Sequence, residues 1–311
     1  MILTGGPAHK PRAIVFVLPP RDRKPAVIVK VAFTPGEAAF LHDEFRALSD
    51  VHGAVPPHLR EGIPAPLGLY RAEEPRAMVA TSAVAGRRLL VPDLGGRGGV
   101  MPRRMLRSFL RGTFAWSREL AEATQGRDER DEQELAERVD RFLTVYRDGG
   151  SALRPIRSFG RAVGRARIRW FPARQHRDVS VGNALVHRGA IRFVDWEHAD
   201  GASEPWYDIA YAPPATALLA QRQRGIASVR EAAKSALGAD TWVGRLVRRE
   251  MEPVWSHPLP LGWAVALTAL STALRRERSG RLGWSDWAEF ARSILADTDF
   301  RRRLDWLAPD W

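Results

Sequence analysis

The chain has 311 residues, a formal net charge of +12, 45% apolar residues and no cysteine. This apolar share is ordinary for a globular protein, so the chain can bury a sizeable core. The lack of cysteine excludes disulfides, thiolate metal sites and a cysteine nucleophile. No uninterrupted apolar run approaches the roughly 20 residues of a membrane helix, and residues 1–7 turn polar before a signal-peptide core develops. We therefore expect a cytoplasmic protein with no membrane partner, built as one large or two modest domains.

The positive charge is spread along the chain and interleaved with acidic residues, and no nucleic-acid-binding module is recognisable. Only four of the 48 basic residues are lysines, at positions 10, 24, 30 and 234, which indicates a codon bias towards arginine as much as a function. Basic character alone supplies non-specific affinity for nucleic acid, so we expect no specific nucleic-acid partner.

The N-terminal part predicts a β-hairpin, because residues 13–18 (AIVFVL) and 26–33 (AVIVKVAF) are apolar runs separated by a charged turn. Lys30 lies in the middle of the second run. A lysine there can simply face solvent at a sheet edge. This chain uses arginine at almost every basic position, however, so a lysine in mid-strand indicates that a compact ammonium is needed there, as at nucleotide phosphates. Upstream, Gly5 and Gly6 are either the remnant of a loop that covers those phosphates or part of a flexible end.

From Pro35 the pattern becomes helical. The apolar positions that recur at three- and four-residue intervals are Phe40, Leu41, Phe45 and Leu48. Two glutamates of this helix, Glu37 and Glu44, are candidates to pair with Lys30. A solvated position on the helix face is the alternative for each glutamate, and it is favoured for Glu37.

Residues 76–83 (RAMVATSA) predict a strand, and most of the chain beyond them predicts helices. One core helix has apolar positions Leu106, Phe109, Leu110, Phe114 and Leu120, and the next has Leu135, Val139, Phe142 and Tyr146. Residues 154–174 carry seven arginines and are expected to form a solvated face, with the steering of an anionic nucleotide by some of them as the alternative. After Tyr211 we expect helices with breaks at Gly225, Gly238, residues 253–262 and residues 280–283.

The most informative stretch begins with a loop that holds Asp178, five residues ahead of Asn183. Residues 184–187 and 191–194 predict two short antiparallel strands joined by a tight turn, and Asp195 follows the second strand. Such a hairpin would bring Asn183 and Asp195 to the same rim, with Asp178 one loop away.

These residues suit one kind of chemistry. Asn183 and Asp195 offer the hard oxygen ligands that suit the Mg²⁺ carried by a nucleotide, and Asp178 is a carboxylate able to accept a proton from an attacking hydroxyl. Phosphoryl transfer depends mostly on positioning and charge neutralisation, and this set of residues supplies both.

The ordered set resembles the catalytic and metal-binding loops of the protein kinase-like superfamily, and most closely its aminoglycoside phosphotransferase and choline kinase branch. Asp195-Trp196-Glu197 stands where protein kinases have Asp-Phe-Gly, and an Asp-x-Glu there is similar to choline kinase-like enzymes. Later, Tyr207-Asp208-Ile209-Ala210 resembles the Asp-Leu-Ala segment of the small-molecule branch.

This resemblance implies an α+β, two-lobed protein kinase-like fold. The small antiparallel-sheet lobe and its hinge would occupy residues 1–86, and the larger, mostly helical lobe residues 87–311. Lys30 would contact the nucleotide phosphates, and Glu44, within a Glu-x-x-x-Leu run, would orient its ammonium. Backbone groups of the hinge would hold the adenine edge, at Thr81, Ser82 and Ala83.

The same resemblance gives roles to the second half of the site. Asp178 would be the catalytic residue that orients or deprotonates the acceptor hydroxyl, while Asn183 and Asp195 would bind Mg²⁺. Further contributions are expected from His176 and Arg177, which would shape the loop, from Asp208, which would organise it through hydrogen bonds, and from Glu197, which would contact the metal or its ligands.

The implied reaction moves the γ-phosphoryl group of ATP or GTP to a hydroxyl of a small acceptor such as an amino-alcohol, a sugar or an antibiotic. A protein substrate is disfavoured, because no Ala-Pro-Glu motif or long activation segment follows Asp195 before Asp208. The alternative is a catalytically inactive pseudokinase that binds nucleotide or a partner without turnover, and the thin phosphate-covering loop motivates it.

Overall fold

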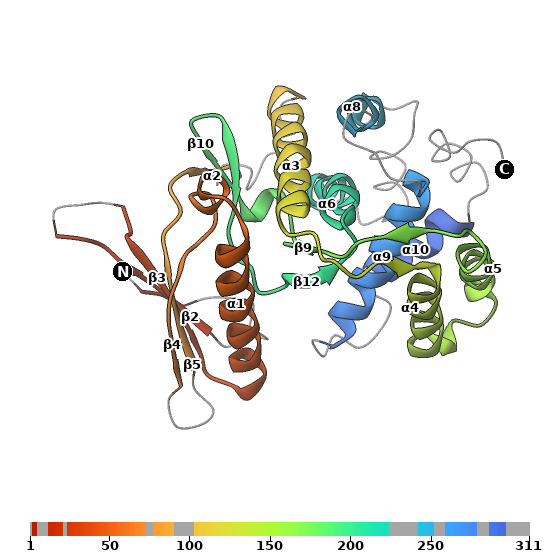
Figure 1. Cartoon of the computed structure of the whole chain (residues 1–311), viewed down its shortest axis with the longest axis horizontal. Coiled ribbons are helices and arrows are strands. Elements are labelled where there is room, and N and C mark those ends of the chain that lie inside the picture. Colours follow the sequence, from red (N-terminus) through yellow and green to blue (C-terminus); the bar gives the residue numbers. More distant parts are fainter. Residues whose placement is uncertain are drawn as a thin grey trace. The chain divides into compact units, whose positions relative to one another are not determined.

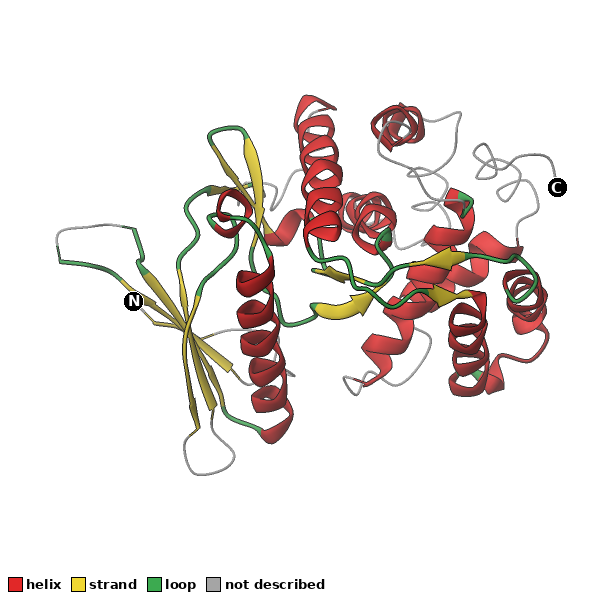
Figure 2. Ribbon diagram, viewed as in Figure 1, coloured by secondary structure: helices red, strands yellow, loops and turns green. Residues whose placement is uncertain are grey.

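The computed structural model describes residues 2–4, 12–20, 24–71, 77–89, 103–223, 242–251, 259–278 and 286–296. Within them an antiparallel sheet near the N-terminus is followed by a mostly helical region, which confirms the predicted α+β class (Figures 1 and 2). The chain divides into two compact units. The first comprises Met1–Leu90, Glu119–Thr124 and Ala173–Ala202, and the second comprises the remainder. The lobe boundary at residue 86 remains a prediction.

The first unit is built on a five-stranded sheet with the order β1-β2-β3-β5-β4. Its strands are β1 (Ile2–Thr4), β2 (Arg12–Val17), β3 (Val27–Ala32), β4 (Pro66–Arg71) and β5 (Ala77–Ser82). All neighbouring strands pair antiparallel, so the predicted hairpin between β2 and β3 is confirmed. In its register Lys30 lies opposite Ile14 on one side and Val79 on the other. The predicted glycines of the phosphate-covering loop, Gly5 and Gly6, lie outside the described residues.

Helix α1 (Pro35–Ala54) covers one face of this sheet (Figure 2). It starts at Thr34, whose hydroxyl accepts a hydrogen bond from the Glu37 N–H at 3.4 Å, and proline occupies its first turn, as helix starts favour. The buried contact between helix and sheet is apolar and consists of Ala32, Leu41 and Val79, with Ala38, Phe45 and Leu69 packed around them. The short helix α2 (Pro57–Arg60) follows.

The second half of the first unit contains the predicted hairpin, β10 (Ala184–His187) and β11 (Ala190–Phe193). The two turn residues, Arg188 and Gly189, have φ values of 50° and 83°. Positive φ at both central positions defines a type I′ turn, whose twist matches that of a tight hairpin. Strand β6 (Arg87–Arg88) pairs with β10, and the 3₁₀ turn η3 (Val181–Asn183) directly precedes β10. Strand β9 (Ala173–Gln175) pairs with β12 (Asp200–Ser203).

The other elements are mostly helices: α3 (Arg103–Ala123), α4 (Glu132–Val145), η2 (Arg147–Leu153), α5 (Arg154–Val163), α6 (Tyr207–Gln223), α8 (Trp242–Met251), α9 (Leu261–Arg278) and α10 (Asp286–Ala296), with the short strands β7 (Arg130–Asp131) and β8 (Arg169–Trp170). The apolar positions predicted for α3 and α4 are all buried. The basic segment is more than a solvated face, because α5 buries Ile156, Phe159 and Val163 beneath its arginines.

The predicted helix breaks at Gly225, Gly238 and residues 280–283 lie outside the described residues. Among the helices that are described, none is both long enough and apolar enough to span a membrane.

Candidate active site

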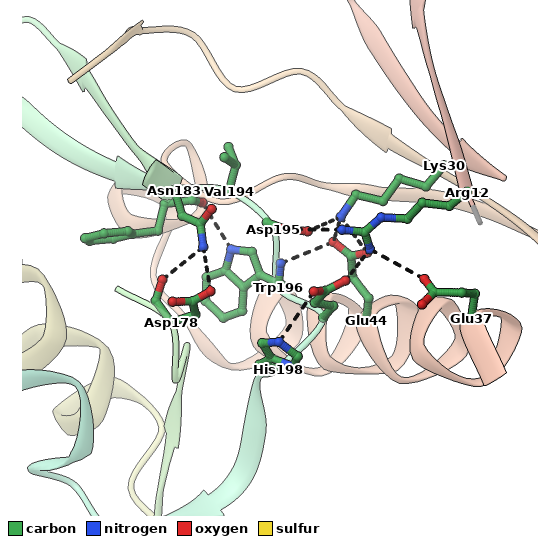
Figure 3. A network of polar contacts seen from close by, with 12 residues as sticks. Arg12, Lys30, Glu37, Glu44, Asp178, Asn183, Val194, Asp195, Trp196 and His198 are labelled. Atoms are coloured by element: carbon green, nitrogen blue, oxygen red, sulfur yellow. Dashed lines mark hydrogen bonds and ion pairs between the residues drawn. The ribbon is translucent and has the colours of Figure 1, made fainter. Parts of the chain in front are cut away.

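The centre of the candidate site is the ammonium of Lys30, which is bonded to two carboxylates (Figure 3). Its Nζ lies 2.7 and 2.8 Å from the two oxygens of Glu44 and 2.5 Å from Oδ1 of Asp195. The predicted choice of Glu44 as the partner of Lys30 agrees with this geometry. Glu37 does not pair with Lys30. It is buried, with Oε2 3.9 Å from Nη1 of Arg12, so the expectation of a solvated Glu37 is wrong.

The charges of this cluster are strongly coupled. Burial opposes the positive charge of Lys30, but the carboxylates of Asp195 and Glu44 outweigh it and raise the pKa of Lys30 above its ordinary value. For Glu44 burial is the largest influence and raises its pKa, although the neighbouring Lys30 acts in the opposite direction. The two carboxylates therefore favour the charged form of Lys30 in the folded chain.

Asp195 is held in an uncommon backbone conformation. Its φ is 68°, in the left-handed region, which aspartate tolerates better than most residues. The next residue, Trp196, fixes this geometry from one side, because its backbone N–H donates to Oε1 of Glu44 at 3.2 Å and its indole N–H donates to the Phe193 carbonyl at 3.1 Å. The indole is fully buried. The carboxylate of Asp195, by contrast, is 28% exposed and is accessible to a ligand.

The loop with Asp178 is tied to the segment before Asp195 through His176. The imidazole is fully buried, its ring centroid lies 4.9 Å from that of Trp196, and its Nε2 is 3.1 Å from the Val194 carbonyl. Its Nδ1 accepts a hydrogen bond from the Asp178 N–H at 3.3 Å. A carbonyl at one nitrogen and a donor at the other indicate the neutral tautomer protonated on Nε2.

Arg177 adds a second tie within the same loop. It has a φ of 65°, and its Nη1 lies 2.5 Å from Oδ2 of Asp200. The loop-shaping positions predicted for His176 and Arg177 thus agree with their contacts.

Asp178 and Asn183 are in direct contact, as Figure 3 shows. The Asn183 side-chain amide donates to Oδ2 of Asp178 at 3.0 Å and to the Asp178 carbonyl at 3.1 Å. The Asn183 backbone carbonyl accepts from the Val194 N–H at 3.0 Å, which joins the loop to the residue before Asp195. The predicted placement of Asn183 and Asp195 at one rim therefore agrees with the hydrogen bonds.

The donor set fits a magnesium ion that is shared with a nucleotide. Among the described residues there is no group of three or more His, Cys, Asp or Glu side chains able to form a complete metal site. Magnesium commonly uses one or two protein ligands and takes the others from phosphates and water. Asn183 can offer its amide oxygen, because only its nitrogen is used in hydrogen bonds to the described residues, and Asp195 can offer a carboxylate oxygen.

The backbone N–H groups at the end of β5 are the expected donors to the adenine edge, and some of them are already used in hydrogen bonds. Thr81 is buried within the strand, the Ser82 N–H donates to the Ala65 carbonyl at 2.8 Å, and the Ala83 N–H donates to the Ala26 carbonyl at 2.9 Å. These two N–H groups are therefore already satisfied. The next one along the chain, that of Val84, makes no hydrogen bond to a described residue, so it is the donor best suited to a base edge.

Gly86 is the last residue of the predicted hinge, and its surroundings admit no side chain. It has a φ of 154°, and a Cβ atom added there would lie 2.8 Å from Cβ of Leu185 in β10. Only glycine fits without a shift, because a side chain at this φ is strained and the space is taken. The end of the predicted hinge is thereby packed against the β10–β11 hairpin.

Sequence reasoning missed Arg12. Its Nη1 donates to the carboxylate of Glu197, and its Nη2 lies 4.0 Å from Oδ2 of Asp195. Burial opposes its charge, but Glu197 and Asp195 outweigh it and raise the pKa of Arg12. Alternation along β2 puts Arg12 on the same face as Ile14, but only the pairing of β2 with β3 brings that face to Lys30. Asp208, fully buried in α6 of the second unit, keeps its predicted role only as a prediction.

Comparisons with known proteins identify the fold. No protein-family model matches the chain, and no curated protein matches it in sequence. Solved structures match nearly its whole length. A putative aminoglycoside phosphotransferase from Ralstonia eutropha JMP134 has a TM-score of 0.58 at 14% identity, covering 97% of this chain and 92% of its own.

Two other matches are complexes. A thermostable mutant of aminoglycoside phosphotransferase APH(4)-Ia with ADP and hygromycin B has a TM-score of 0.57 at 16% identity, with coverage of 97% and 93%. The amicoumacin kinase hAmiN, in complex with AMP-PNP, Ca²⁺ and its ligand, has a TM-score of 0.51 at 14% identity, with coverage of 99% and 89%. The chain therefore has the protein kinase-like fold of small-molecule phosphotransferases, which confirms the predicted resemblance at the level of fold.

Proposed function

We propose that this chain is a Mg²⁺-dependent kinase that moves the γ-phosphoryl group of a nucleoside triphosphate to a hydroxyl of a small molecule. The observation that carries the proposal is the Lys30–Glu44–Asp195 cluster, with a nucleotide-phosphate cation and a metal-binding carboxylate 2.5 Å apart. The contact between Asp178 and Asn183 in the same compact unit supports it. The fold shared with small-molecule phosphotransferases is consistent with this chemistry but does not by itself establish it.

In this proposal Lys30 binds the phosphates and Glu44 holds its ammonium in place. Asn183 and Asp195 would hold the Mg²⁺, and a bound Mg²⁺ would neutralise charge on the transferred group. Because Lys30 already contacts one oxygen of Asp195, a phosphate oxygen near the metal would lie within reach of the ammonium.

Asp178 is the proposed catalytic base. The acceptor oxygen attacks the γ-phosphorus, the bond between that phosphorus and the β–γ bridging oxygen breaks, and the hydroxyl proton passes to the Asp178 carboxylate. The hydrogen bond from the Asn183 amide orients this carboxylate and couples it to the metal site. A positioned base of this kind typically contributes a factor of about 10²–10⁴ to the rate.

The candidates for the donor nucleotide and for the acceptor can be reduced to a few chemical classes. Solved structures of this fold contain ADP, AMP-PNP or GDP, and the Val84 N–H, which bonds to no described residue, suits a purine edge, so we propose ATP or GTP as donor. For the acceptor we propose a compact hydroxyl compound, such as an amino-alcohol, a sugar or an antibiotic. The net charge of +12 disfavours the approach of a polycationic acceptor by long-range repulsion.

The nucleotide site can be tested by thermal stability with and without Mg²⁺ and nucleotide. A ligand at 100 times its dissociation constant adds about 2.7 kcal/mol of stability, so Mg²⁺-ATP or Mg²⁺-GTP should raise the melting temperature of the wild-type chain. Asp195→Asn should abolish the magnesium-dependent part of this rise. Asp43→Asn, a change of the same kind at an exposed position of α1, should leave the rise intact. A wild-type chain that gains no stability from either nucleotide at millimolar concentration would overturn the proposal.

A further inference from the structure

Arg12 and Lys30 project from the same face of the sheet. In the β2–β3 register Ile14 lies opposite Lys30 and Arg12 lies opposite Ala32, so Arg12 is the diagonal neighbour of Lys30. Diagonal neighbours in an antiparallel pair are about 7–8 Å apart, within reach of each other's long side chains. The site therefore contains a second cation, placed one strand away from Lys30 on the face that α1 covers.

The two cations converge on Asp195. Figure 3 shows both side chains directed at its carboxylate. Lys30 contacts Oδ1 at 2.5 Å, and Nη2 of Arg12 lies 4.0 Å from Oδ2. Phosphates bound to a metal ion on Asp195 would thus approach the guanidinium as well as the ammonium. A guanidinium suits this place, because its planar fork of donors matches the oxygens of a phosphate group.

The contacts of Arg12 leave part of its hydrogen-bonding capacity unused. The Arg12 side chain is 11% exposed, and among its guanidinium nitrogens only Nη1 donates to a described residue, the carboxylate of Glu197. Nη2 is beyond hydrogen-bond distance of Asp195, and Nη1 is 3.9 Å from Glu37. A buried ion pair contributes little net stability in general, so the pair with Glu197 does not by itself account for a charged residue here.

We propose that Arg12 is a second phosphate-binding residue, which grips the triphosphate of the nucleotide beside Lys30 while Glu197 holds its guanidinium in place. This inference rests on the proposed function and names a residue that the family resemblance did not supply. Arg12 acts on the phosphates only, so the binding of a nucleoside without phosphates does not depend on it.

The test compares the affinities of adenosine and Mg²⁺-ATP, or of guanosine and Mg²⁺-GTP if that is the tighter donor. Arg12→Gln alone would remove the cation that Glu197 pairs with, so the main variant is the neutral pair Arg12→Gln with Glu197→Gln, and Glu197→Gln alone is its reference, because it reports any effect of Glu197 on the metal. We expect the affinity of the neutral pair for the triphosphate to fall by about tenfold to 100-fold, because charge-assisted hydrogen bonds are lost, while its affinity for the nucleoside stays the same. The triphosphate affinity of Arg12→Lys should lie between those of the wild type and the neutral pair, since lysine keeps the positive charge but lacks the planar fork of donors.

Arg46→Gln, at an exposed position of α1, is the control for loss of one positive charge and should bind both ligands as the wild type does. Equal triphosphate affinity in the wild type, the neutral pair and Arg12→Lys overturns the role of Arg12 and leaves the proposed function intact. A parallel loss of nucleoside and triphosphate affinity also overturns it, because this pattern marks a structural role. A wild-type chain that binds no nucleotide overturns the proposed function and this inference together.

Discussion

Asp178→Asn is expected to lower the rate of phosphoryl transfer by about 10²–10⁴-fold and to leave the affinity for Mg²⁺-nucleotide unchanged. The substitution keeps the shape of the side chain but removes the carboxylate that accepts the proton. Asn183, which donates to Oδ2 of Asp178, can still donate to the amide oxygen, so the loop should keep its geometry. With water as the acceptor, the rate can be followed as slow magnesium-dependent hydrolysis of ATP or GTP.

The matched control for Asp178→Asn is a change of the same kind away from the site. Asp43→Asn on the exposed face of α1 should hydrolyse nucleotide at the wild-type rate. If Asp178→Asn also does so, the catalytic role of Asp178 is wrong. If the wild-type chain binds Mg²⁺-nucleotide but neither hydrolyses it nor transfers its phosphoryl group, the pseudokinase alternative is correct.

Trp196→Ala is expected to lower the free energy of unfolding by about 3–5 kcal/mol, the usual range for truncating a fully buried aromatic side chain. The indole fills the space beside His176, and its N–H is bonded to the Phe193 carbonyl at 3.1 Å. Loss of this packing also frees the backbone at Asp195, so nucleotide binding should weaken together with stability. Urea unfolding followed by circular dichroism measures the first effect, and nucleotide titration the second.

Trp196→Phe provides the matched comparison. It keeps an aromatic ring but loses the hydrogen bond to Phe193, so its effect on stability should be clearly smaller than that of alanine. A loss below about 1 kcal/mol for the alanine variant would contradict the account, because a fully buried indole cannot be removed at so small a penalty.

Helices and strands whose apolar residues recur at regular spacing could be predicted from the sequence. The hairpin of β2 and β3 and the helices α1, α3 and α4 follow from apolar runs and from three- and four-residue spacing. The β10–β11 hairpin follows from β-branched strands around a glycine-containing turn. Asp178, Asn183 and Asp195 lie at the ends or rims of these local elements, so their mutual placement was predictable too.

Features that depend on long-range pairing were not predictable. Strand β4 contains Pro66 and Gly68, which weaken any strand pattern, and it forms because β5 pairs with it. The face on which Arg12 lies depends on the register across the long β2–β3 connection, and a shift of one residue would have turned it away. Glu37 is buried because Arg12 faces it, which α1 alone does not reveal.

The hinge shows a similar limit. Its position at the end of β5 was predictable, but which N–H groups are available depends on the carbonyls of Ala65 and Ala26, which belong to segments far from it in sequence. The donors of Ser82 and Ala83 are used by these carbonyls, and Val84 follows as the candidate. Backbone hydrogen bonding of this kind becomes visible only when the neighbouring strands are placed.

The central claim, transfer of a phosphoryl group to a small hydroxyl compound, is tested most directly by ³¹P NMR. The purified chain is incubated with Mg²⁺-ATP or Mg²⁺-GTP and pools of neutral, anionic and cationic hydroxyl compounds. We predict a new phosphomonoester signal with at least an equal amount of nucleoside diphosphate, dependent on Mg²⁺ and greatly reduced in Asp178→Asn, most readily with neutral or anionic pools. A chain that binds the nucleotide yet forms no phosphomonoester from any pool, and no diphosphate above the Asp178→Asn level, would contradict the claim.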